Sequence, residues 1–162
     1  MIGTVREVTP NVDAGTLLAG AQFVDAFRVE IGAATVNARE ACMRMVLHGP
    51  RWIDVLIRLR NILVTPFGLK TSGEGAPAPH GMIGLFPVLS ETPERLVAGF
   101  NDHHLDFRIV VDVACDADGR WVTSTTLVRT HNLLGRTYLG LIMPFHKLVV
   151  RSMMGRVVAP TR

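Results

Sequence analysis

The strongest constraint on the fold of this chain is the alternation of apolar and polar side chains in residues 104–115. Side chains two residues apart lie on the same face of a β-strand, so one face of this segment is apolar. That face consists of Leu105, Phe107, Ile109, Val111, Val113 and Cys115. The opposite face consists of His104, Asp106, Arg108, Val110 and Asp112. A strand of this kind needs a sheet around it and a second layer that covers the apolar face.

A turn signal after this strand predicts a hairpin with residues 120–131. The turn lies at residues 116–119, Asp-Ala-Asp-Gly, and an even-membered loop places Cys115 or Ala117 opposite Arg120. Either register gives the new strand the same two faces. The apolar face then gains Ser124, Thr126, Val128 and Thr130, and the polar face gains Thr125, Leu127, Arg129 and His131. An odd-membered loop with a bulge would exchange the two sets.

A second turn signal, Asn101-Asp102, predicts a hairpin on the upstream side of the same strand. It places Leu96 opposite Phe107 and Ala98 opposite Leu105. The apolar faces of the three strands match, so two independent hairpins agree on which side of the sheet is interior.

Hydrophobic periodicity predicts the remaining elements. Residues 22–31 are expected to form a first strand, and residues 83–89 and 95–100 two more. Thr35 is the expected N-cap of a helix that ends at His48, and Pro50 the expected first residue of a second helix. The apolar stripe of that second helix would be Trp52, Leu56, Leu59 and Leu63. Residues 1–20 are expected to be an irregular lead-in, and residues 70–81 a mobile loop that gates a site.

The last predicted element is a long amphipathic helix at residues 135–157, with a bend at Pro144. The order of one strand, two helices, several antiparallel strands and one long helix is typical of an α+β chain. Because a one-sided sheet must be covered, we expect a curved antiparallel sheet wrapped around the C-terminal helix. At 162 residues the chain is expected to be a single domain.

Composition excludes several classes of protein. Apolar residues make up 48% and the formal charge is only +3, which argues against disorder and gives no basic patch for nucleic acid. The longest uncharged stretch near the C-terminus, residues 137–146, is too short to span a membrane, and no early apolar run resembles a signal peptide. We therefore expect a cytoplasmic protein. Cys42 and Cys115 are too far apart for a zinc knuckle, and both are expected to be buried thiols.

Several motifs resemble an uncharacterised bacterial domain-of-unknown-function family. They are HLDFR at 104–108, LGRTYL at 134–139, PFHKLVVR at 144–151, and the shorter RLRN at 58–61 and FGLK at 67–70. The likeness extends over residues 20–156. What the resemblance implies is a START-like helix-grip domain (the SRPBCC superfamily), the type shared by pollen-allergen and polyketide cyclase proteins. The dehydrogenase-like module sometimes attached to that domain is absent, because the chain has no Gly-rich dinucleotide motif. No established activity comes with the resemblance.

The hydroxyls on the apolar face indicate a cavity beneath the C-terminal helix. A buried hydroxyl without a partner costs about 1–3 kcal/mol, so Ser124, Thr126 and Thr130 suit a space that holds water or a ligand. The alternative is a solid core in which the hydroxyls bond to backbone. The expected cavity lining is Phe107, Ile109, Ser124, Thr126, Tyr138 and Ile142. The bend at Pro144 would direct His146 toward the mouth of the cavity, although packing or capping is the more usual role of a helical histidine.

The polar strand face carries a possible ion network. His104, Asp106, Arg108, Arg129 and His131 lie on it. Two histidines and a carboxylate can bind iron, but the two arginines would repel a metal and are expected to pair with Asp106. We therefore expect no metal and no cofactor, and a network that is structural or faces a partner.

Three functions follow from these features. The first is binding of a small hydrophobic or amphipathic molecule between sheet and C-terminal helix. The second is an acid–base enzyme of the cyclase, dehydratase or isomerase type on such a ligand, with His146 or Tyr138 as candidates. The third is a non-catalytic interaction module that uses the polar strand face or the basic edge of Lys147, Arg151 and Arg156 to meet a protein or an anionic membrane. No nucleophile motif is present, and the sequence leaves a homodimer open.

Overall fold

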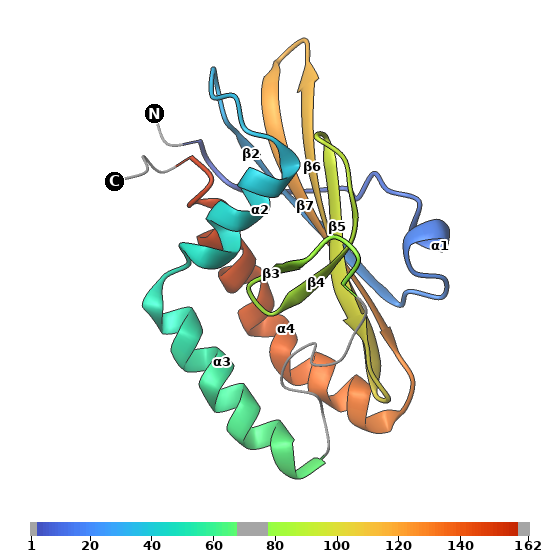
Figure 1. Cartoon of the computed structure of the whole chain (residues 1–162). Helices are drawn as coiled ribbons and strands as arrows, with labels where there is room; N and C mark the ends of the chain where they lie inside the picture. Colours follow the sequence, from blue (N-terminus) through green and yellow to red (C-terminus); the bar gives the residue numbers. More distant parts are fainter. Residues whose placement is uncertain (1–2, 68–77, 159–162) are drawn as a thin grey trace.

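The computed structural model describes residues 3–67 and 78–158. The elements in these residues are, in chain order, β1 (Arg6–Val8), α1 (Ala14–Leu17), β2 (Phe23–Glu30), α2 (Ala38–Leu47), α3 (Arg51–Val64), the 3-10 turn η1 (Thr65–Phe67), β3 (Met82–Ile83), β4 (Phe86–Glu91), β5 (Arg95–Asn101), β6 (Leu105–Asp116), β7 (Gly119–Thr130) and α4 (Leu133–Met154). The predicted α+β class is confirmed. Figure 1 shows a curved sheet with α2, α3 and α4 on one side and α1 on the other.

The strands form one antiparallel sheet in the order β1-β2-β7-β6-β5-β4-β3. In the β6–β7 hairpin Cys115 lies opposite Arg120, and the loop consists of Ala117 and Asp118. This is one of the two predicted even registers, so the predicted faces are confirmed. The odd-numbered side chains from Leu105 onward point toward α4, together with the even-numbered side chains of β7.

The predicted register of the β5–β6 hairpin is wrong by four residues. Leu96 lies opposite Val111 and Ala98 opposite Ile109, and the hairpin closes at Asn101 and Asp106. The turn is longer than a two-residue loop because the Asp102 N–H donates to the Leu105 carbonyl and the Asp102 carboxylate accepts from the His103 N–H. A shift by an even number leaves every side chain on its predicted face.

The boundaries of two helices differ from the prediction. Asn37, not Thr35, is the N-cap of α2, because its side chain accepts the Glu40 N–H at 2.8 Å. Asn132 caps α4 in the same way, accepting the Gly135 N–H at 2.9 Å, so α4 begins and ends earlier than predicted. Pro50 precedes α3 as its N-cap. The side chains of Leu56, Leu59 and Leu63 lie outside the described residues, as does most of the predicted loop at 70–81.

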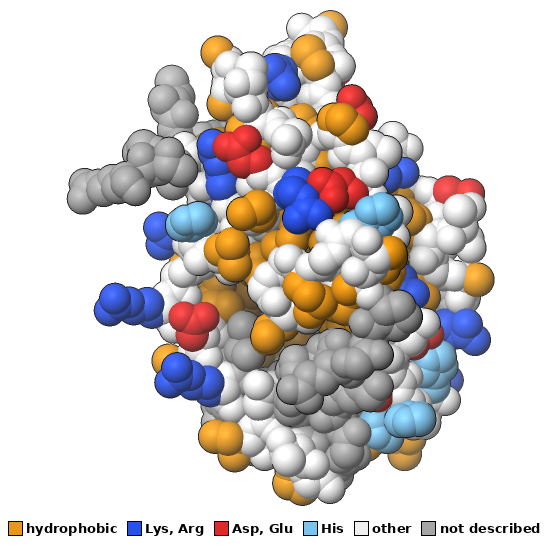
Figure 2. Space-filling view, in the orientation of Figure 1, with side chains coloured by type: hydrophobic (Ala, Val, Ile, Leu, Met, Phe, Trp, Pro, Cys, Tyr) orange, Lys and Arg blue, Asp and Glu red, His pale blue; other side chains and the backbone are white. Residues whose placement is uncertain are grey.

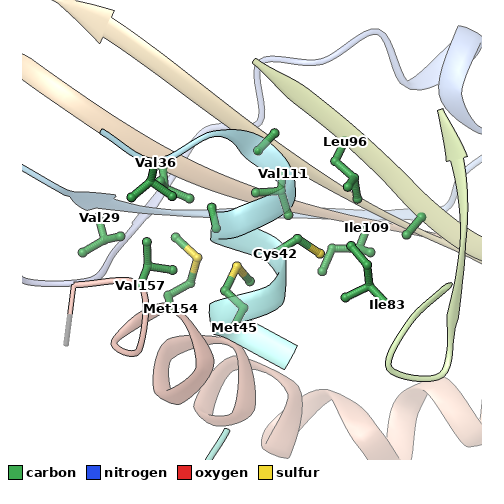
Figure 3. Close-up of a cluster of buried hydrophobic side chains, with 14 of the residues drawn as sticks. Val29, Val36, Cys42, Met45, Ile83, Leu96, Ile109, Val111, Met154 and Val157 are labelled. Atoms are coloured by element: carbon green, nitrogen blue, oxygen red, sulfur yellow. The ribbon is translucent and has the colours of Figure 1, made fainter. Parts of the chain in front are cut away.

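The main hydrophobic core lies between the sheet and the helices α2 and α4 (Figure 3). Side chains from the inner faces of β2, β5 and β6 contact both α2 and the last turns of α4, which lie on the same side of the sheet. The labelled members are Val29, Val36, Cys42, Met45, Ile83, Leu96, Ile109, Val111, Met154 and Val157. The core therefore lies against one side of the last turns of α4.

The predicted irregular lead-in contains β1 and α1, and it covers the outer face of the sheet. Leu18 packs there in a second cluster of buried side chains with Val97, Val110 and Leu127. Val110 and Leu127 belong to the face predicted to be polar. Part of that face is therefore buried, because the N-terminal segment folds back over it (Figure 1).

The start of α4 packs tightly against the β5–β6 hairpin. A Cβ at Gly135 would overlap the His104 carbonyl, whereas a Cβ at Gly140 would meet nothing within 4 Å. Figure 1 shows α4 curving along its length, and Pro144 lies inside it. Proline lacks the N–H that would bond to the carbonyl four residues earlier, which favours a bend there.

Alanine substitutions at these two glycines are expected to have opposite effects. Gly135→Ala should lower the free energy of unfolding by about 1–3 kcal/mol, because the new methyl group overlaps backbone. Gly140→Ala should raise it by about 0.5–1 kcal/mol, because alanine is the better helix former and nothing obstructs it. Urea unfolding followed by circular dichroism measures both. Equal effects of the same sign would contradict the close contact at Gly135.

The two cysteines differ, and the expectation that both are buried is wrong for Cys115. Cys115 lies near the tip of the β6–β7 hairpin, beyond the helical cover, and is exposed; Cys42 is buried in the core. Burial raises the pKa of the Cys42 thiol to about 12, a rise that the charge of Arg39 only partly offsets.

The free energy of unfolding should therefore fall as the pH rises from about 9 toward 12. In this range the unfolded chain loses the Cys42 proton while the folded chain keeps it, so high pH favours unfolding. Urea unfolding at a series of pH values should show a shallower decline in Cys42→Ala than in the wild type. Cys115→Ala, which removes an exposed thiol, should decline like the wild type. Parallel declines in Cys42→Ala and the wild type would refute this linkage.

Candidate functional site

The predicted cavity residues lie on facing surfaces of the sheet and α4. On the sheet, Ile109 lies opposite Thr126 and Phe107 opposite Val128, and Ser124 lies one step further along β7. On α4, Tyr138, Ile142 and His146 follow one another at four-residue spacing, and so lie in a row along the helix. The same row continues to the buried residues Val150 and Met154.

A histidine and a carboxylate meet between these two surfaces. His146 Nε2 of α4 lies 3.3 Å from Asp25 Oδ1 and 3.1 Å from Asp25 Oδ2, and Asp25 projects from β2. Both side chains are largely withdrawn from water, with exposed fractions of 14% for His146 and 6% for Asp25. The edge of the His146 ring also meets the Phe23 ring, with centroids 5.8 Å apart. The Asp25–His146 pair is thus held by packing as well as by a hydrogen bond.

Polar groups without partners lie close to this pair. Asp25 is the cross-strand neighbour of Thr126, and Ser124 is the neighbour of Phe27, two residues along the same face. The imidazole lies beside both Asp25 oxygens, but only the contact with Oδ1 has the geometry of a hydrogen bond, so Oδ2 is held by the charge contact alone in the described part of the chain. Ser124 Oγ is buried and has none either. Buried polar atoms are nearly always bonded, so the Asp25 carboxylate and the Ser124 hydroxyl can both still receive a polar partner.

The inner face of the sheet is apolar and partly open in the next row of paired residues, at Phe107. Phe107 lies 5.6 Å from Phe86 and 5.7 Å from Phe100 between ring centroids, and all three rings are half-buried. Tyr138 and Ile142 of α4 are also half-buried, in contrast to Val150 and Met154. Along this row of α4, burial therefore decreases from Met154 toward Tyr138, before the helix start is buried again at Gly135. Figure 2 shows a hollow with mostly hydrophobic walls on the helix side of the molecule.

Asp25 is not among the site residues predicted from the sequence, although its position in the first strand indicates a buried carboxylate. Asp25 falls between Phe23 and Phe27 in the even-spaced series that predicts the inner face of the first strand. A carboxylate on a face that is otherwise apolar is costly to bury alone, so it indicates a partner from another element. The partner, His146, lies 121 residues later. Periodicity carries no information on which of the helical residues would reach it.

Thr130 differs from the other two hydroxyls. Its Oγ donates to Gln22 Oε1 at 2.5 Å, and its N–H donates to the same oxygen at 2.9 Å. The bond is to a side chain, not to backbone or a ligand. Thr130 is therefore satisfied within the protein, whereas the buried Ser124 hydroxyl has no partner in the described part of the chain, as is also true of Thr125 on the outer face.

The polar strand face forms a network with different partners from those expected. Asp106 binds His131, with 3.0 Å between Oδ2 and Nε2. Arg108 donates to the carbonyls of Phe100 and Phe107 and to Asn101 Oδ1. Burial lowers the pKa of the Arg108 guanidinium, and the charge of Asp106 opposes this effect.

The remaining members of this face support the loops around it. Arg129 donates to the Ala19 carbonyl at 3.2 Å. His104 Nδ1 accepts from Asn132 Nδ2 at 2.8 Å, which ties it to the N-cap of α4. These contacts hold backbone segments together and do not converge on one point. In residues 3–67 and 78–158 there is no group of His, Cys, Asp or Glu side chains that could hold a metal ion.

The family model that matches this chain is described as Protein of unknown function (DUF2867), and the match covers residues 17–153. The chain belongs to the DUF2867 family. The match extends from the end of α1 to the last turns of α4, so this DUF2867 domain includes both Asp25 and His146. Comparisons with curated proteins and with solved structures found no match. Within the described residues, no helix has the length and hydropathy needed to cross a membrane.

Proposed function

We propose that this DUF2867 protein binds a small hydrophobic or amphipathic molecule between the inner face of its sheet and α4. The apolar part of the molecule would lie against Phe107 and Ile142, which are only half-buried, and against the edge of the core at Ile109. Its polar end would lie near Asp25, Ser124 and His146. The resemblance to START-like domains is in line with this arrangement, because a curved sheet that grips a long helix encloses space between them.

The observation that carries the proposal is the buried polar edge of an otherwise apolar space. An unpaired buried hydroxyl costs about 1–3 kcal/mol. A ligand group that bonds to Ser124 Oγ and Asp25 Oδ2 would remove that cost. Ligand sites typically combine mostly apolar walls with a few polar groups that fix orientation, and the proposed site would have this composition.

Binding of 1-anilinonaphthalene-8-sulfonate, an amphipathic fluorescent probe, tests the proposal. We expect saturable binding to the wild type at micromolar concentrations. Ile142→Trp should weaken it by about tenfold, because the larger side chain occupies the space under α4. Leu141→Trp is the matched control: it lies next in the chain, is 69% exposed, and should change the affinity by less than about twofold. Absence of saturable binding to the wild type, or equal effects of the two variants, would refute the proposal.

The Asp25–His146 pair also favours a second candidate, acid–base catalysis on the bound molecule. A carboxylate that binds one imidazole nitrogen orients the ring and leaves the other nitrogen, Nδ1, to take up or release a proton. A substrate with a C–H bond next to a carbonyl would lose its proton to the imidazole and form an enolate, and the reverse step would return a proton to the same carbon.

Deuterium exchange distinguishes catalysis from binding alone. Small enolisable ketones incubated in D2O with the wild type should gain deuterium faster than without protein, as measured by mass spectrometry. The His146→Gln variant should lose this acceleration while still binding the fluorescent probe. No acceleration by the wild type across a series of such ketones would leave ligand binding as the function.

A further inference from the structure

The Asp25 carboxylate has more capacity to accept hydrogen bonds than the protein fills. It is 6% exposed and, within the described residues, accepts one hydrogen bond, from His146 Nε2 to Oδ1 at 3.3 Å. Its second oxygen, Oδ2, has only the charge contact with the same nitrogen, at 3.1 Å. An ionised carboxylate offers about four sites for hydrogen bonds and can donate none. Any further partner of this group must therefore be a donor.

The sheet around Asp25 is apolar apart from one hydroxyl. Along β2 its neighbours on the inner face are Phe23 and Phe27, and its cross-strand neighbour on β7 is Thr126. The next residue in that row of the sheet is Ile109. None of these side chains donates a hydrogen bond to Asp25 in the described part of the chain. Because apolar surroundings screen charge poorly, the sign of a charge brought to this carboxylate has a large effect.

Two further basic side chains lie on this part of α4, and both are engaged elsewhere. Lys147 is paired with a carboxylate of β1, and the Arg151 guanidinium lies over the fully buried Phe27 ring at 5.6 Å. Phe27 is on the core side of Asp25, whereas the half-buried Phe107 is one row of paired residues away on the other side. A molecule that enters along Phe107 therefore meets the Asp25 carboxylate before it reaches Arg151.

We propose that the site selects molecules whose polar end donates a hydrogen bond, a hydroxyl or a primary ammonium group, over molecules that end in a carboxylate. The donor bonds to the free side of the Asp25 carboxylate, and the apolar tail extends toward Phe107. An anionic head group at the same place would meet like charge and would leave the acceptor unfilled. The inference deepens the proposed function and rests on it, because it assigns the head group of the proposed ligand.

Displacement of N-phenyl-1-naphthylamine tests the inference. This fluorescent probe has the rings and the N–H donor of anilinonaphthalene sulfonate without the sulfonate, and should bind at least as tightly. Two matched pairs of competitors are compared at neutral pH. Octan-1-ol and its isomer heptyl methyl ether differ in whether the oxygen carries a hydrogen, and octylamine and octanoate differ in the sign of their charge. Octan-1-ol should displace the probe at a concentration about tenfold below that of the ether, and octylamine about tenfold below that of octanoate.

Two substitutions that each remove one carboxylate assign the preference to Asp25. Asp25→Asn keeps the size of the side chain and an oxygen that accepts from His146, but removes the charge. In this variant the preference for octylamine over octanoate should fall below about twofold. Glu7→Gln removes an exposed carboxylate that is paired with Lys147 on the neighbouring strand β1, and should keep the tenfold preference. Circular dichroism shows whether both variants are folded, and the wild-type comparison decides the inference even if Asp25→Asn is not.

Failure of this inference is distinguishable from failure of the proposed function. If neither fluorescent probe binds saturably, the ligand site itself is refuted. If a probe binds but the two members of either pair displace it equally, or octanoate displaces it better than octylamine, the ligand site stands and the donor preference is wrong. In that case the imidazole of His146, rather than the carboxylate, receives the head group. A preference for octylamine that a folded Asp25→Asn variant retains would also overturn the inference. The stronger competitor of octan-1-ol and octylamine identifies which donor the site prefers.

Discussion

Phe27→Ala is expected to lower the free energy of unfolding by about 3–5 kcal/mol. Phe27 is fully buried in β2, in the cluster formed with the last turns of α4, and the Arg151 guanidinium covers its ring at 5.6 Å. Truncation therefore removes the burial of a large ring and leaves a cavity between two layers that cannot collapse independently.

Urea unfolding of Phe27→Ala beside Phe145→Ala measures this effect. Phe145 is 55% exposed on the outer face of α4, so its truncation should change the free energy of unfolding by less than about 1 kcal/mol. A loss below about 1 kcal/mol for Phe27→Ala would mean that the sheet and α4 are not tightly packed at this point.

His146→Leu is expected to destabilise the fold by about 3 kcal/mol. The substitution keeps the volume of the side chain but leaves the Asp25 carboxylate buried without its partner. Removal of one member of a buried pair is much more costly than the pair itself is worth, because the remaining group stays desolvated.

A double substitution that removes both members of the pair supplies the decisive comparison. Asp25→Leu combined with His146→Leu should recover most of the lost stability, because two apolar side chains need no partner. Lys147→Leu, which breaks the exposed pair with Glu7 one residue further along α4, should cost less than about 1 kcal/mol. If the double variant is as unstable as His146→Leu, the loss comes from packing of the imidazole and not from the unpaired carboxylate.

Recovery of stability in the double variant would also bear on function. A pair that apolar residues replace without loss of stability is not needed for folding, so its presence points to a role in the site. His146 faces the sheet, whereas Phe145 and Leu148 face outward. Variants at these two outward positions therefore leave the proposed ligand site undisturbed.

The predictable part of this fold rests on local periodicity. The two-residue period of β6 assigned Phe107 and Ile109 to the interior, and the Asp-Ala-Asp-Gly turn placed Ser124 and Thr126 beside them. Even the four-residue error in the β5–β6 register left the faces unchanged, because only an odd shift exchanges them. The residues of the candidate site on the sheet could therefore be found before any coordinates were known.

Other features depend on contacts that no local pattern encodes. Asn37 rather than Thr35 caps α2, although both residue types are suitable caps, and the first residue of the helix, Ala38, donates its N–H to the distant Pro93 carbonyl. The N-terminal segment reads as irregular but packs over Val110 and Leu127, which turns part of a polar face into a second core. The partner of Asp106 is His131 and not an arginine, because Arg108 instead binds the carbonyls of its own hairpin.

The sequence by itself determined the strands β2, β5, β6 and β7, their two faces and the existence of the last helix, because each of these follows from the spacing of neighbouring residues. Only the tertiary structure decided that His146 meets Asp25, that Ser124 keeps an unpartnered hydroxyl, and that Leu141 and Phe145 remain exposed. These outcomes depend on how α4 lies across the sheet, which is fixed by packing between residues more than a hundred positions apart in the chain.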